Sequence, residues 1–293
     1  QHYWGALGGL SLPNSIHPDS RVFLGLPLYH VSGFSLLLRC FLRGATLVLA
    51  TEKRPLPTIL RLGSITHTSI VLPQLVQLAS DAGAYPALKQ LLFGGSACPE
   101  ALYLKAQHLP VVYSYGLTEL GGQVATGLQP TGFTPVAYRA VNCRNNILYI
   151  RGRCLSLGYL LHDDTGWRLT QQTDPDGYIN TRDTGYIDSQ NRLHITGRLD
   201  DLFISGGENI QPQQIESVLL THPDITVCCV VPKPCATYGQ RPVAFIHPFK
   251  PPSESWLQAH LHRYWQPVAY YPWPDSVPWH KPNRKQLAGR VCY

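Results

Sequence analysis

The stretch GRLDDLFISGGENIQPQQIE, residues 197–216, places a short apolar run between two polar and flexible segments. The apolar run at 202–204 predicts a strand, and the paired glycines after it predict a turn. Pro212 then favours the first position of a helix, where its missing N–H costs no hydrogen bond. A plain strand–turn–helix does not need so many charged side chains. We therefore place a domain boundary at about residues 198–201.

Upstream of this boundary, strand-like and helix-like segments alternate with short connections. The predicted strands cover residues 21–28, 46–50, 68–72, 90–93 and 111–115, and the predicted helices cover 34–42, 56–62, 74–79 and 99–107. This alternation predicts an α/β fold built from βαβ units around a mostly parallel sheet. From about residue 146, short strands at 147–151, 177–179 and 192–196 indicate a β-rich subdomain.

Downstream of the boundary, the pattern predicts a compact α+β unit with strands at 202–205, 226–231 and 242–246 and helices at 212–221 and 253–264. We expect residues 1–199 to belong to a large domain. Residues 200–293 are expected to form a small, mobile C-terminal domain.

The composition indicates a globular chain and excludes several classes of function. Of the 293 residues, 44% are hydrophobic and 14% are charged, which is not typical of a disordered protein. The net charge of +6 is scattered, so it favours small anions rather than nucleic acid. No apolar run has the length of a membrane span, and no signal peptide opens the chain. The oligomeric state, including a homo-oligomer, stays open.

The eight cysteines contain no CxxC pair, and two of them are direct neighbours. This spacing argues against a zinc site and against a disulfide framework. We expect buried, reduced thiols in a cytoplasmic protein.

Two motifs end predicted strands of the large domain. FGGSA, residues 93–97, carries glycines that let a ligand approach the backbone. YGLTE, residues 115–119, joins an aromatic face for a purine, a hydroxyl for a phosphate and a carboxylate for Mg²⁺. The ordinary interpretation is a turn at Gly116 and a helix cap at Thr118, and for any single residue it stays the simpler one.

Three further residues have ordinary interpretations when each is considered alone. Asp183 in TRDTGYID lies just ahead of a predicted turn, where it would cap the turn or accept hydrogen bonds from ribose hydroxyls. His30 in PLYHVSGF lies at a predicted strand end, and a lone histidine is more often structural than catalytic. Lys281 in HKPNRKQL lies on a proline-flanked loop, where a solvated lysine is the default.

Taken together and in order, these motifs resemble those of the adenylate-forming enzymes, which include acyl-CoA synthetases, luciferases and peptide-synthetase adenylation domains. The matching segments are PLYHVSG, FGGSA, YGLTE, ILYIRGRCLSLGYL, TRDTGYID with GRLDDLFISGGENIQPQQIE, and the lysine tail. They span nearly the whole chain. Within the family, LPLYHVSG running into RGATLVL, together with FISGGENIQP, is similar to the o-succinylbenzoate–CoA ligases of menaquinone biosynthesis.

The resemblance implies a two-step reaction that uses ATP, Mg²⁺ and coenzyme A. A carboxylate attacks the α-phosphate of ATP and gives acyl-AMP and pyrophosphate. Coenzyme A then displaces AMP and gives the acyl thioester. Members of the family carry a Ser/Thr/Gly-rich phosphate loop ahead of the segment that matches residue 1. Because this loop precedes the segment that matches residue 1, we expect it and the preceding third of a full-length member to be absent from the given sequence.

The resemblance assigns the nucleotide site to four segments. Tyr115 would stack on adenine, and Asp183 would bind the ribose hydroxyls. Arg198 would support the ribose or a phosphate with its planar, always-charged fork. The backbone that lines the adenine and acyl pockets would come from Gly94, Gly95, Ser96 and Ala97.

The reacting groups and the hinge are assigned in the same way. Thr118 would bond the α-phosphate, Glu119 would hold Mg²⁺, and Lys281 would stabilise the first transition state. His30 would border the acyl pocket and the route of coenzyme A. Asp200 matches the family's hinge position. The narrow backbone of Gly206 and Gly207 would line the pantetheine tunnel.

The segment that follows YGLTE indicates which kind of carboxylic acid the protein would take as its substrate. Its small, mixed-polarity residues suit a short polar acid better than an alkyl chain, and Gln123 and Thr126 could hydrogen-bond a distal carboxylate. Arg39 is a further candidate for the matching charge, while an ordinary loop is the alternative for the segment. Two other functions stay open: a synthetase for another aryl or fatty acid, and a non-catalytic protein with the same fold.

Overall fold

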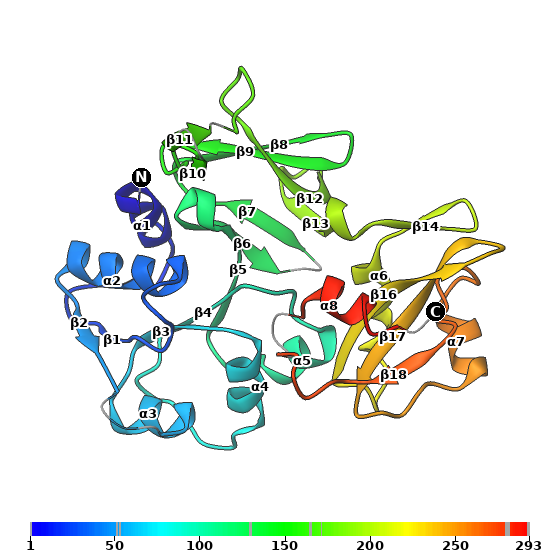
Figure 1. Ribbon diagram of the computed structural model, residues 1–293. Helices are drawn as coiled ribbons and strands as arrows, with labels where there is room; N and C mark the ends of the chain where they lie inside the picture. Colours follow the sequence, from blue (N-terminus) through cyan, green and yellow to red (C-terminus); the bar gives the residue numbers. More distant parts are fainter. Residues whose placement is uncertain are drawn as a thin grey trace. The chain divides into compact units, whose positions relative to one another are not determined.

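A computed structural model describes residues 2–50, 52, 54–128, 131–163, 166–170, 172–278 and 282–291 of the chain. The chain divides into two compact units (Figure 1). The large unit comprises Gln1–Ala97, Lys105–Thr181 and Gly185–Ile195, and the small unit comprises Cys98–Leu104, Arg182–Thr184 and Thr196–Tyr293. Among the described residues, no helix is both long and apolar enough to cross a membrane.

Five parallel strands lie at one end of an 11-stranded sheet, in the order β2-β1-β3-β4-β5. Their bounds are β1 Arg21–Phe23, β2 Thr46–Val48, β3 His67–Ile70, β4 Gln90–Phe93 and β5 Val111–Leu117. The helices of this part are α1 His2–Leu10, α2 Val31–Arg43, α3 Leu56–Leu62 and α4 Leu72–Ser80. The next helix along the chain, α5 Glu100–Lys105, belongs to the small unit except for its last residue. Leu36 and Cys40 of α2 pack against Val22 of β1, which fixes α2 on the sheet.

The β-rich part continues the same sheet, because β5 pairs in parallel with β4 and antiparallel with β6. The order beyond β5 is β6-β7-β13-β12-β9-β8. The bounds are β6 Gly122–Leu128, β7 Gly132–Pro135, β8 Arg139–Arg144, β9 Ile147–Gly152, β12 Ile179–Ile187 and β13 Leu193–Arg198. Two short 3₁₀ helices, η1 Thr118–Leu120 and η2 Leu199–Asp201, follow β5 and β13.

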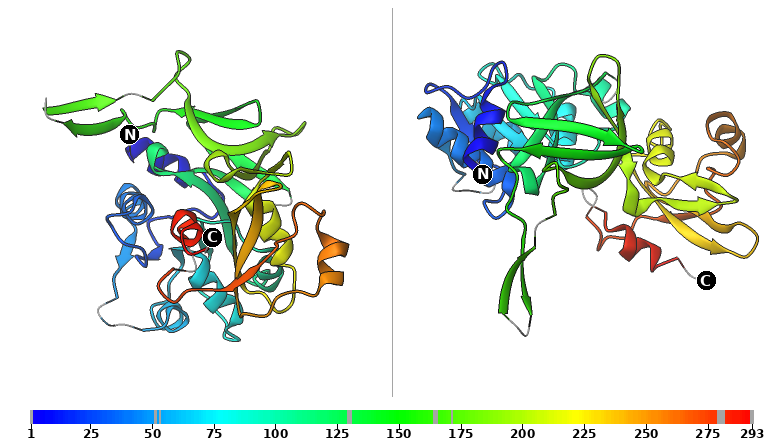
Figure 2. Two further views of the ribbon diagram at one scale, coloured as in Figure 1. Left: turned by 45° about the vertical axis from the view of Figure 1, so that its right-hand side comes forward. Right: turned by 90° about the horizontal axis from the view of Figure 1, so that it is seen from above.

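A separate hairpin stands away from this sheet (Figure 2). It consists of β10 Tyr159–Asp163 and β11 Gly166–Thr170, paired antiparallel. Every residue of β10 is exposed, so neither of its faces packs on a core.

The small unit is built on a second sheet in the order β15-β14-β17-β16, with β18 beside β17. Its elements are β14 Phe203–Ser205, β15 Glu208–Ile210, α6 Pro212–Leu219, β16 Val227–Cys235, β17 Gly239–His247, α7 Glu254–His260, β18 Tyr270–Pro272 and α8 Arg284–Ala288. Side chains alternate across β16, so Val230 joins a core with α6 and α7, whereas Cys229 and Val231 join a core with α8. The sheet is therefore covered on both faces.

The structure confirms the predicted α/β fold and shows that the parallel and β-rich parts form one sheet. Two local expectations were wrong. Asp183 lies within β12 rather than ahead of a turn. The alternation of this strand is hidden in the sequence, because Thr181, Asp183 and Gly185, three of its four buried positions, are small or polar. His30 is the N-cap residue of α2, since β1 already ends at Phe23.

Candidate active site

The loop after β4 is shaped by glycine and contains a buried hydroxyl. Gly95 has a φ of 89°, a conformation that favours glycine, and Gly94 and Gly95 directly follow the strand. The Oγ atom of Ser96 is buried and has no hydrogen-bond partner among the described residues. A buried hydroxyl without a partner costs free energy, so this loop has a polar group available to a ligand. Ala97 follows and is exposed.

The YGLTE segment lies on β5 and η1, also in the large unit. Tyr115 belongs to β5, where a bulge shifts the register between it and Gly116. A Cβ atom at Gly116 would lie 2.5 Å from the carbonyl oxygen of Gly122, so the bulge requires glycine. Thr118 opens η1 with an exposed side chain, and Leu117 rather than Thr118 is its N-cap.

The Glu119 carboxylate is half-buried and accepts a hydrogen bond from the hydroxyl of Tyr159. This bond raises the pKa of Tyr159 to about 12. Among the described residues, no cluster of three or more acidic, histidine or cysteine side chains could enclose a metal ion. A single carboxylate is nevertheless the donor set that suits Mg²⁺, which keeps several waters and takes its other ligands from substrate phosphates. Glu119 thus fits one magnesium ligand.

His30 has an exposed side chain that makes no cap hydrogen bond with α2. Its ring lies against the ring of Tyr29, with 4.6 Å between the centroids. Gly33 allows α2 to begin here, because a Cβ atom at that position would lie 2.3 Å from the carbonyl oxygen of Pro27. His30 therefore presents an imidazole at the start of α2.

A buried arginine that has no acidic partner among the described residues lies in the large unit. Arg39 of α2 is 6% exposed and donates from its Nη2 to the Oε1 of Gln123, at 2.9 Å. Its Nε atom and the Nε2 of Gln123 are buried without hydrogen-bond partners among the described residues. The charged neighbour that acts on it is Arg139, and no described carboxylate forms an ion pair with it. Burial, followed by repulsion from Arg139, lowers the pKa of Arg39 to about 10.

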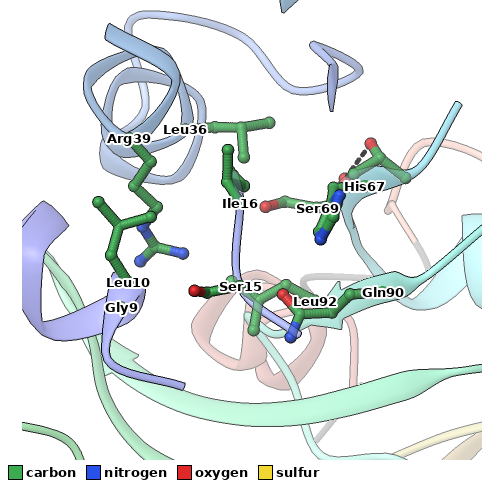
Figure 3. Close-up of a pocket in the computed structure, with 11 residues that line it drawn as sticks. Gly9, Leu10, Ser15, Ile16, Leu36, Arg39, His67, Ser69, Gln90 and Leu92 are labelled. Carbon is green, nitrogen blue, oxygen red and sulfur yellow. Dashed lines mark hydrogen bonds between the residues drawn. The ribbon is translucent and has the colours of Figure 1, made fainter. Parts of the chain in front are cut away.

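Arg39 also lines a small cavity between α1, α2 and the parallel strands (Figure 3). Polar groups contributed by Ser15, His67, Ser69 and Gln90 line the same cavity. Gly9 makes room for the guanidinium, because a Cβ atom there would lie 2.3 Å from the Cζ of Arg39. Motif reasoning missed these cavity residues, since they lie outside the recognisable segments.

The structure brings together only part of the suggested acid-binding set. Gln123 lies on β6 with its side chain on Arg39. Thr126 lies three positions further along the same strand, so it faces the opposite side of the sheet. We keep Gln123 and Arg39 as candidates for the distal carboxylate and leave Thr126 out.

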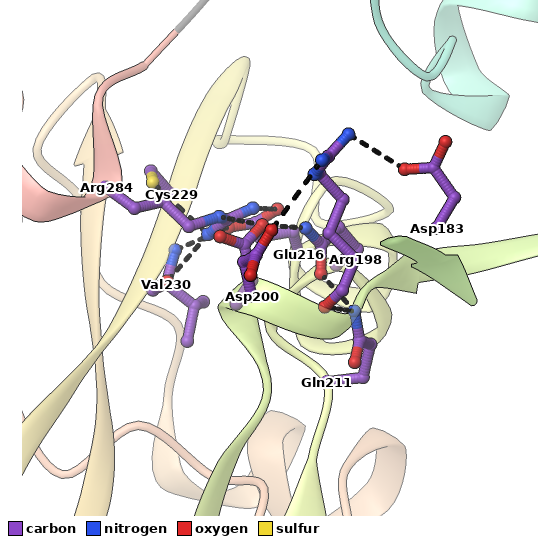
Figure 4. Close-up of polar contacts among 10 residues, drawn as sticks. Asp183, Arg198, Asp200, Gln211, Glu216, Cys229, Val230 and Arg284 are labelled. Atoms are coloured by element: carbon purple, nitrogen blue, oxygen red, sulfur yellow. Dashed lines mark hydrogen bonds and ion pairs between the residues drawn. The ribbon is translucent and has the colours of Figure 1, made fainter. Parts of the chain in front are cut away.

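In the small unit, Asp183 and Arg198 form an ion pair across neighbouring strands (Figure 4). The Nη1 of Arg198 donates to the Oδ1 of Asp183 at 2.9 Å, and the Asp183 side chain is 7% exposed. The carbonyl oxygen of Arg198 accepts a hydrogen bond from the side-chain amide of Gln211, at 2.9 Å. That amide occupies the space beside Gly197, where a Cβ atom would lie only 1.8 Å from its Nε2.

The candidate hinge residue Asp200 lies in η2 and is bound by two arginines. The Nε of Arg182 donates to both of its carboxylate oxygens, at 2.8 and 2.9 Å, and the Nη2 of Arg198 lies 3.8 Å from its Oδ2. The hydrogen bonds from Arg182 lower the pKa of Asp200. Arg182 itself has a φ of 60°, a left-handed conformation that is uncommon for a residue with a side chain.

Gly206 and Gly207 form the tight turn between β14 and β15, with φ values of 61° and 85°. Two positive φ values are what a two-residue hairpin turn requires. A Cβ atom at Gly206 would lie 2.8 Å from the Cε1 of Tyr264, whereas Gly207 faces open space. Lys281 lies outside the described residues.

Comparisons with known proteins agree with this architecture. The family model described as "AMP-binding enzyme" matches residues 6–160, and that of the "AMP-binding enzyme C-terminal domain" matches residues 214–278. The 2-succinylbenzoate–CoA ligase of Escherichia coli K12 is 36% identical over 94% of this chain and 60% of its own length. The Haemophilus influenzae enzyme is 35% identical over 90% of this chain and 60% of its own.

Solved structures of related enzymes superimpose closely. An E. coli MenE variant with bound OSB-AMS gives a TM-score of 0.85 at 31% identity, over 99% of this chain and 64% of that one. The Bacillus subtilis o-succinylbenzoate–CoA synthetase with the acyl-adenylate OSB-AMP gives 0.83 at 26% identity, over 100% and 65%. The chain thus spans about 60% of the length of the curated relatives that it matches. On the strength of these matches, it belongs to the AMP-binding enzyme family.

Proposed function

We propose that the full-length protein is an ATP-dependent acid–CoA ligase that acts on o-succinylbenzoate. The curated relatives at 36% and 35% identity carry the name 2-succinylbenzoate–CoA ligase, which supports the assignment. A Bacillus subtilis o-succinylbenzoate–CoA synthetase at 26% identity was solved with ATP and magnesium ion, which supports the same nucleotide and metal here.

The observation that carries the choice of acid is the buried Arg39–Gln123 pair. o-Succinylbenzoate has an aromatic ring, a ketone and two carboxylates, so one carboxylate can react while the other must be held. A buried cation is costly unless it is paired, and Arg39 has no carboxylate partner among the described residues. An anionic substrate group would supply that partner. A long alkyl chain would leave the guanidinium without one.

In the first half-reaction, an oxygen of the substrate carboxylate attacks the α-phosphorus of ATP and the bond to pyrophosphate breaks. Tyr115 holds the adenine, and Asp183, oriented by Arg198, accepts hydrogen bonds from the ribose hydroxyls. Thr118 donates to an α-phosphate oxygen. Lys281 places its ammonium on the carboxylate and phosphate oxygens and stabilises the transition state electrostatically. Glu119 would hold Mg²⁺, which neutralises charge on the phosphates when bound.

In the second half-reaction, the coenzyme A thiolate attacks the acyl carbon and the bond to the AMP oxygen breaks. We place the domain boundary at residues 199 and 200, so that Asp200 is the hinge. The turn of Gly206 and Gly207 would line the pantetheine route, and its narrow backbone suits that role. His30, exposed at the start of α2, borders the acyl pocket. The seven described cysteines are free thiols, which supports a reducing, cytoplasmic setting.

The proposal is tested by comparing kcat/KM of the full-length protein for o-succinylbenzoate, benzoate and octanoate, because this ratio measures differential transition-state binding. We expect o-succinylbenzoate to be preferred by a wide margin. Equal or better turnover of benzoate or octanoate would reject the acid and favour another synthetase. Failure to form acyl-AMP from any acid in a panel, measured by mass spectrometry, would favour the non-catalytic alternative.

A further inference from the structure

Glu119 of η1 is contacted at both its main chain and its carboxylate by one short segment of the large unit. The segment covers residues 153–158 and leads from β9 into β10, which begins at Tyr159. The backbone N–H of Ser156 donates to the carbonyl oxygen of Glu119 at 2.7 Å. The hydroxyl of Tyr159 donates to the Oε1 of Glu119. The segment therefore fixes where this residue lies and also where its carboxylate points.

The segment is itself anchored, so it can serve as a support. The side chain of Cys154 is 1% exposed, and the N–H of Arg153 donates to the carbonyl oxygen of Tyr138 at 3.3 Å. Gly158 has a φ of 138°, a conformation that favours glycine, and it directly precedes Tyr159. The hydroxyl thus reaches Glu119 from a chain that is held on both its main-chain and its buried side.

The partner of the Glu119 carboxylate is a neutral hydroxyl, which has a chemical consequence. Among the described residues, no arginine, lysine or histidine forms an ion pair with Glu119. A cationic partner would compete with a metal ion for the carboxylate oxygens. A hydroxyl donates to one oxygen and leaves the negative charge in place. The Oε2 of Glu119 therefore keeps its capacity for Mg²⁺, which proteins bind through one or two carboxylates together with substrate phosphates.

Tyrosine suits this task because a rigid ring carries its hydroxyl. A free glutamate side chain samples several rotamers, and ordering it on binding costs entropy. The ring of Tyr159 has few torsions of its own, and its backbone is held in β10 by pairing with Thr170 of β11. The hydrogen bond orients the carboxylate before the ligand arrives, which lowers the cost of binding.

Packing of the ring does not account for a tyrosine at this position. Tyr159 is 42% exposed and opens a strand that is exposed at every residue. The hairpin that it begins stands away from the main sheet (Figure 2). The contact that distinguishes tyrosine from phenylalanine here is the hydrogen bond to Glu119.

We propose that Tyr159 is a positioning residue for the magnesium site, which holds the Glu119 carboxylate in the orientation that binds Mg²⁺ with ATP. This inference rests on the proposed function, and in particular on Glu119 as a magnesium ligand. Tyr159 touches neither the substrate nor the metal ion; it acts through Glu119. Its loss weakens the step that uses Mg²⁺ and ATP and spares thioester formation from acyl-AMP, in which no triphosphate takes part.

The first test measures ATP binding to the full-length protein by calorimetry, without any acid, in Mg²⁺ and in EDTA. Tyr159→Phe removes only the hydroxyl, and Tyr149→Phe is the matched control. Tyr149 lies on β9 of the same unit, and its hydroxyl accepts a hydrogen bond from the Nδ2 of Asn180 at 3.3 Å. We expect Tyr159→Phe to weaken ATP binding in Mg²⁺ by about 3- to 10-fold, the range that one hydrogen bond supplies. Binding in EDTA should not change.

The second test separates the half-reactions. Acyl-AMP formation is measured by rapid quench over a series of Mg²⁺ concentrations, and thioester formation is measured from supplied acyl-AMP and coenzyme A. In Tyr159→Phe, the Mg²⁺ concentration for half-maximal adenylation should rise by about 3- to 10-fold, and saturating Mg²⁺ should restore the rate. Thioester formation should equal that of the unmodified protein.

A double-mutant cycle with Glu119→Gln shows whether Tyr159 acts through the carboxylate. In the Glu119→Gln background, Tyr159→Phe should add no further loss of ATP affinity in Mg²⁺. Equal weakening of ATP binding in Mg²⁺ and in EDTA, equal losses in the two half-reactions, or full additivity in the cycle would overturn the inference. All measurements are made well below the lowest melting temperature of the variants, so that a loss of stability is not mistaken for a loss of binding.

Failure of the inference is distinguishable from failure of the proposed function. If the unmodified protein forms no acyl-AMP from any acid in a panel, the proposed function is at fault. If it forms acyl-AMP but Glu119→Gln binds ATP in Mg²⁺ as tightly as the unmodified protein, Glu119 is not the magnesium ligand and the inference is refuted with it. If Glu119→Gln weakens binding and Tyr159→Phe behaves like Tyr149→Phe, only the positioning role is refuted.

Discussion

Replacing Arg39 by methionine removes the buried charge and keeps an unbranched, apolar stem. In the structure, Arg39 donates to Gln123, and its Nε has no described partner. Removing an uncompensated buried charge favours folding, while leaving Gln123 without its donor disfavours it. The two effects oppose each other, so we expect the ligand-free protein to keep nearly its full stability. The loss should appear in substrate selection.

The size of that loss follows from the geometry. Truncating one partner of a buried, hydrogen-bonded charge pair costs about 2–5 kcal/mol, and about 1.4 kcal/mol corresponds to tenfold. One N–H of Arg39 is already engaged by Gln123, which leaves the Nε and the remaining Nη protons for a substrate carboxylate. We therefore expect kcat/KM for o-succinylbenzoate to fall by at least about 30-fold. Benzoate lacks the second carboxylate, so its kcat/KM should change by less than about 3-fold.

The assay is steady-state thioester formation by the full-length protein with each acid, together with urea unfolding of the ligand-free protein. Arg43→Met, on the same helix, is the matched control, because the described contact of Arg43 is to the carbonyl oxygen of Leu10. An equal fall for both acids would show that Arg39 supports the fold or the nucleotide site instead. A loss of stability above about 3 kcal/mol would refute the claim that its charge is uncompensated.

Three other changes give sharp outcomes. Gly9→Ala should reproduce the selectivity loss of Arg39→Met, because the added Cβ atom would lie 2.3 Å from the guanidinium carbon of Arg39. In the double variant, the ratio of kcat/KM for o-succinylbenzoate to kcat/KM for benzoate should show no further loss. Asp200→Pro fixes the backbone angle φ at the candidate hinge. Rapid-quench measurements should therefore find thioester formation slowed far more than adenylation. An unchanged rate of thioester formation would exclude a hinge at this residue. Asp188→Asn tests a carboxylate whose pKa is lowered, first by its hydrogen bond to His194. A carboxylate whose pKa is lowered in the folded state adds stability that is fully present above about pH 3.8 and disappears as the pH falls through the folded-state pKa. The urea midpoint of the wild type should therefore exceed that of the variant at pH 7. The two midpoints should approach each other below pH 3.8. A gap that stays constant down to pH 2 would contradict this.

The strands and helices that the sequence predicted are those with strong local patterns. The buried parallel strand β4 is a mostly apolar run that two glycines follow, and α2 has an apolar stripe at helical spacing. These signals depend only on neighbours in the chain, so the sequence was sufficient to find them.

The missed elements have weak local signals. α1 contains three glycines, which are poor helix formers, yet the helix needs them for close packing. A Cβ atom at Gly5 would lie 3.1 Å from the carbonyl oxygen of Gly121, and one at Gly8 would lie 1.8 Å from the Nη1 of Arg139. All of β10 and the middle of β11 are exposed, so this hairpin shows no alternation between buried apolar and exposed polar positions.

The motifs of the sequence single out candidate site residues, but they do not show the contacts among them. The motifs singled out Asp183 and Arg198, which the structure joins in an ion pair. Arg39 and Gln123 are 84 positions apart, and no local pattern shows that one would donate to the other. Pairings of this kind arise from tertiary packing, which a single sequence does not display.

The packing of Gln211 against Gly197 has a consequence for how this region can diverge. The amide of Gln211 fills the volume that a side chain at 197 would need, and it donates to the carbonyl oxygen of Arg198. A larger residue at 197 would therefore have to push this amide aside, and the carbonyl oxygen of Arg198 would then lose its hydrogen bond. The two positions are consequently coupled, because the cost of a substitution at 197 depends on which residue stands at 211.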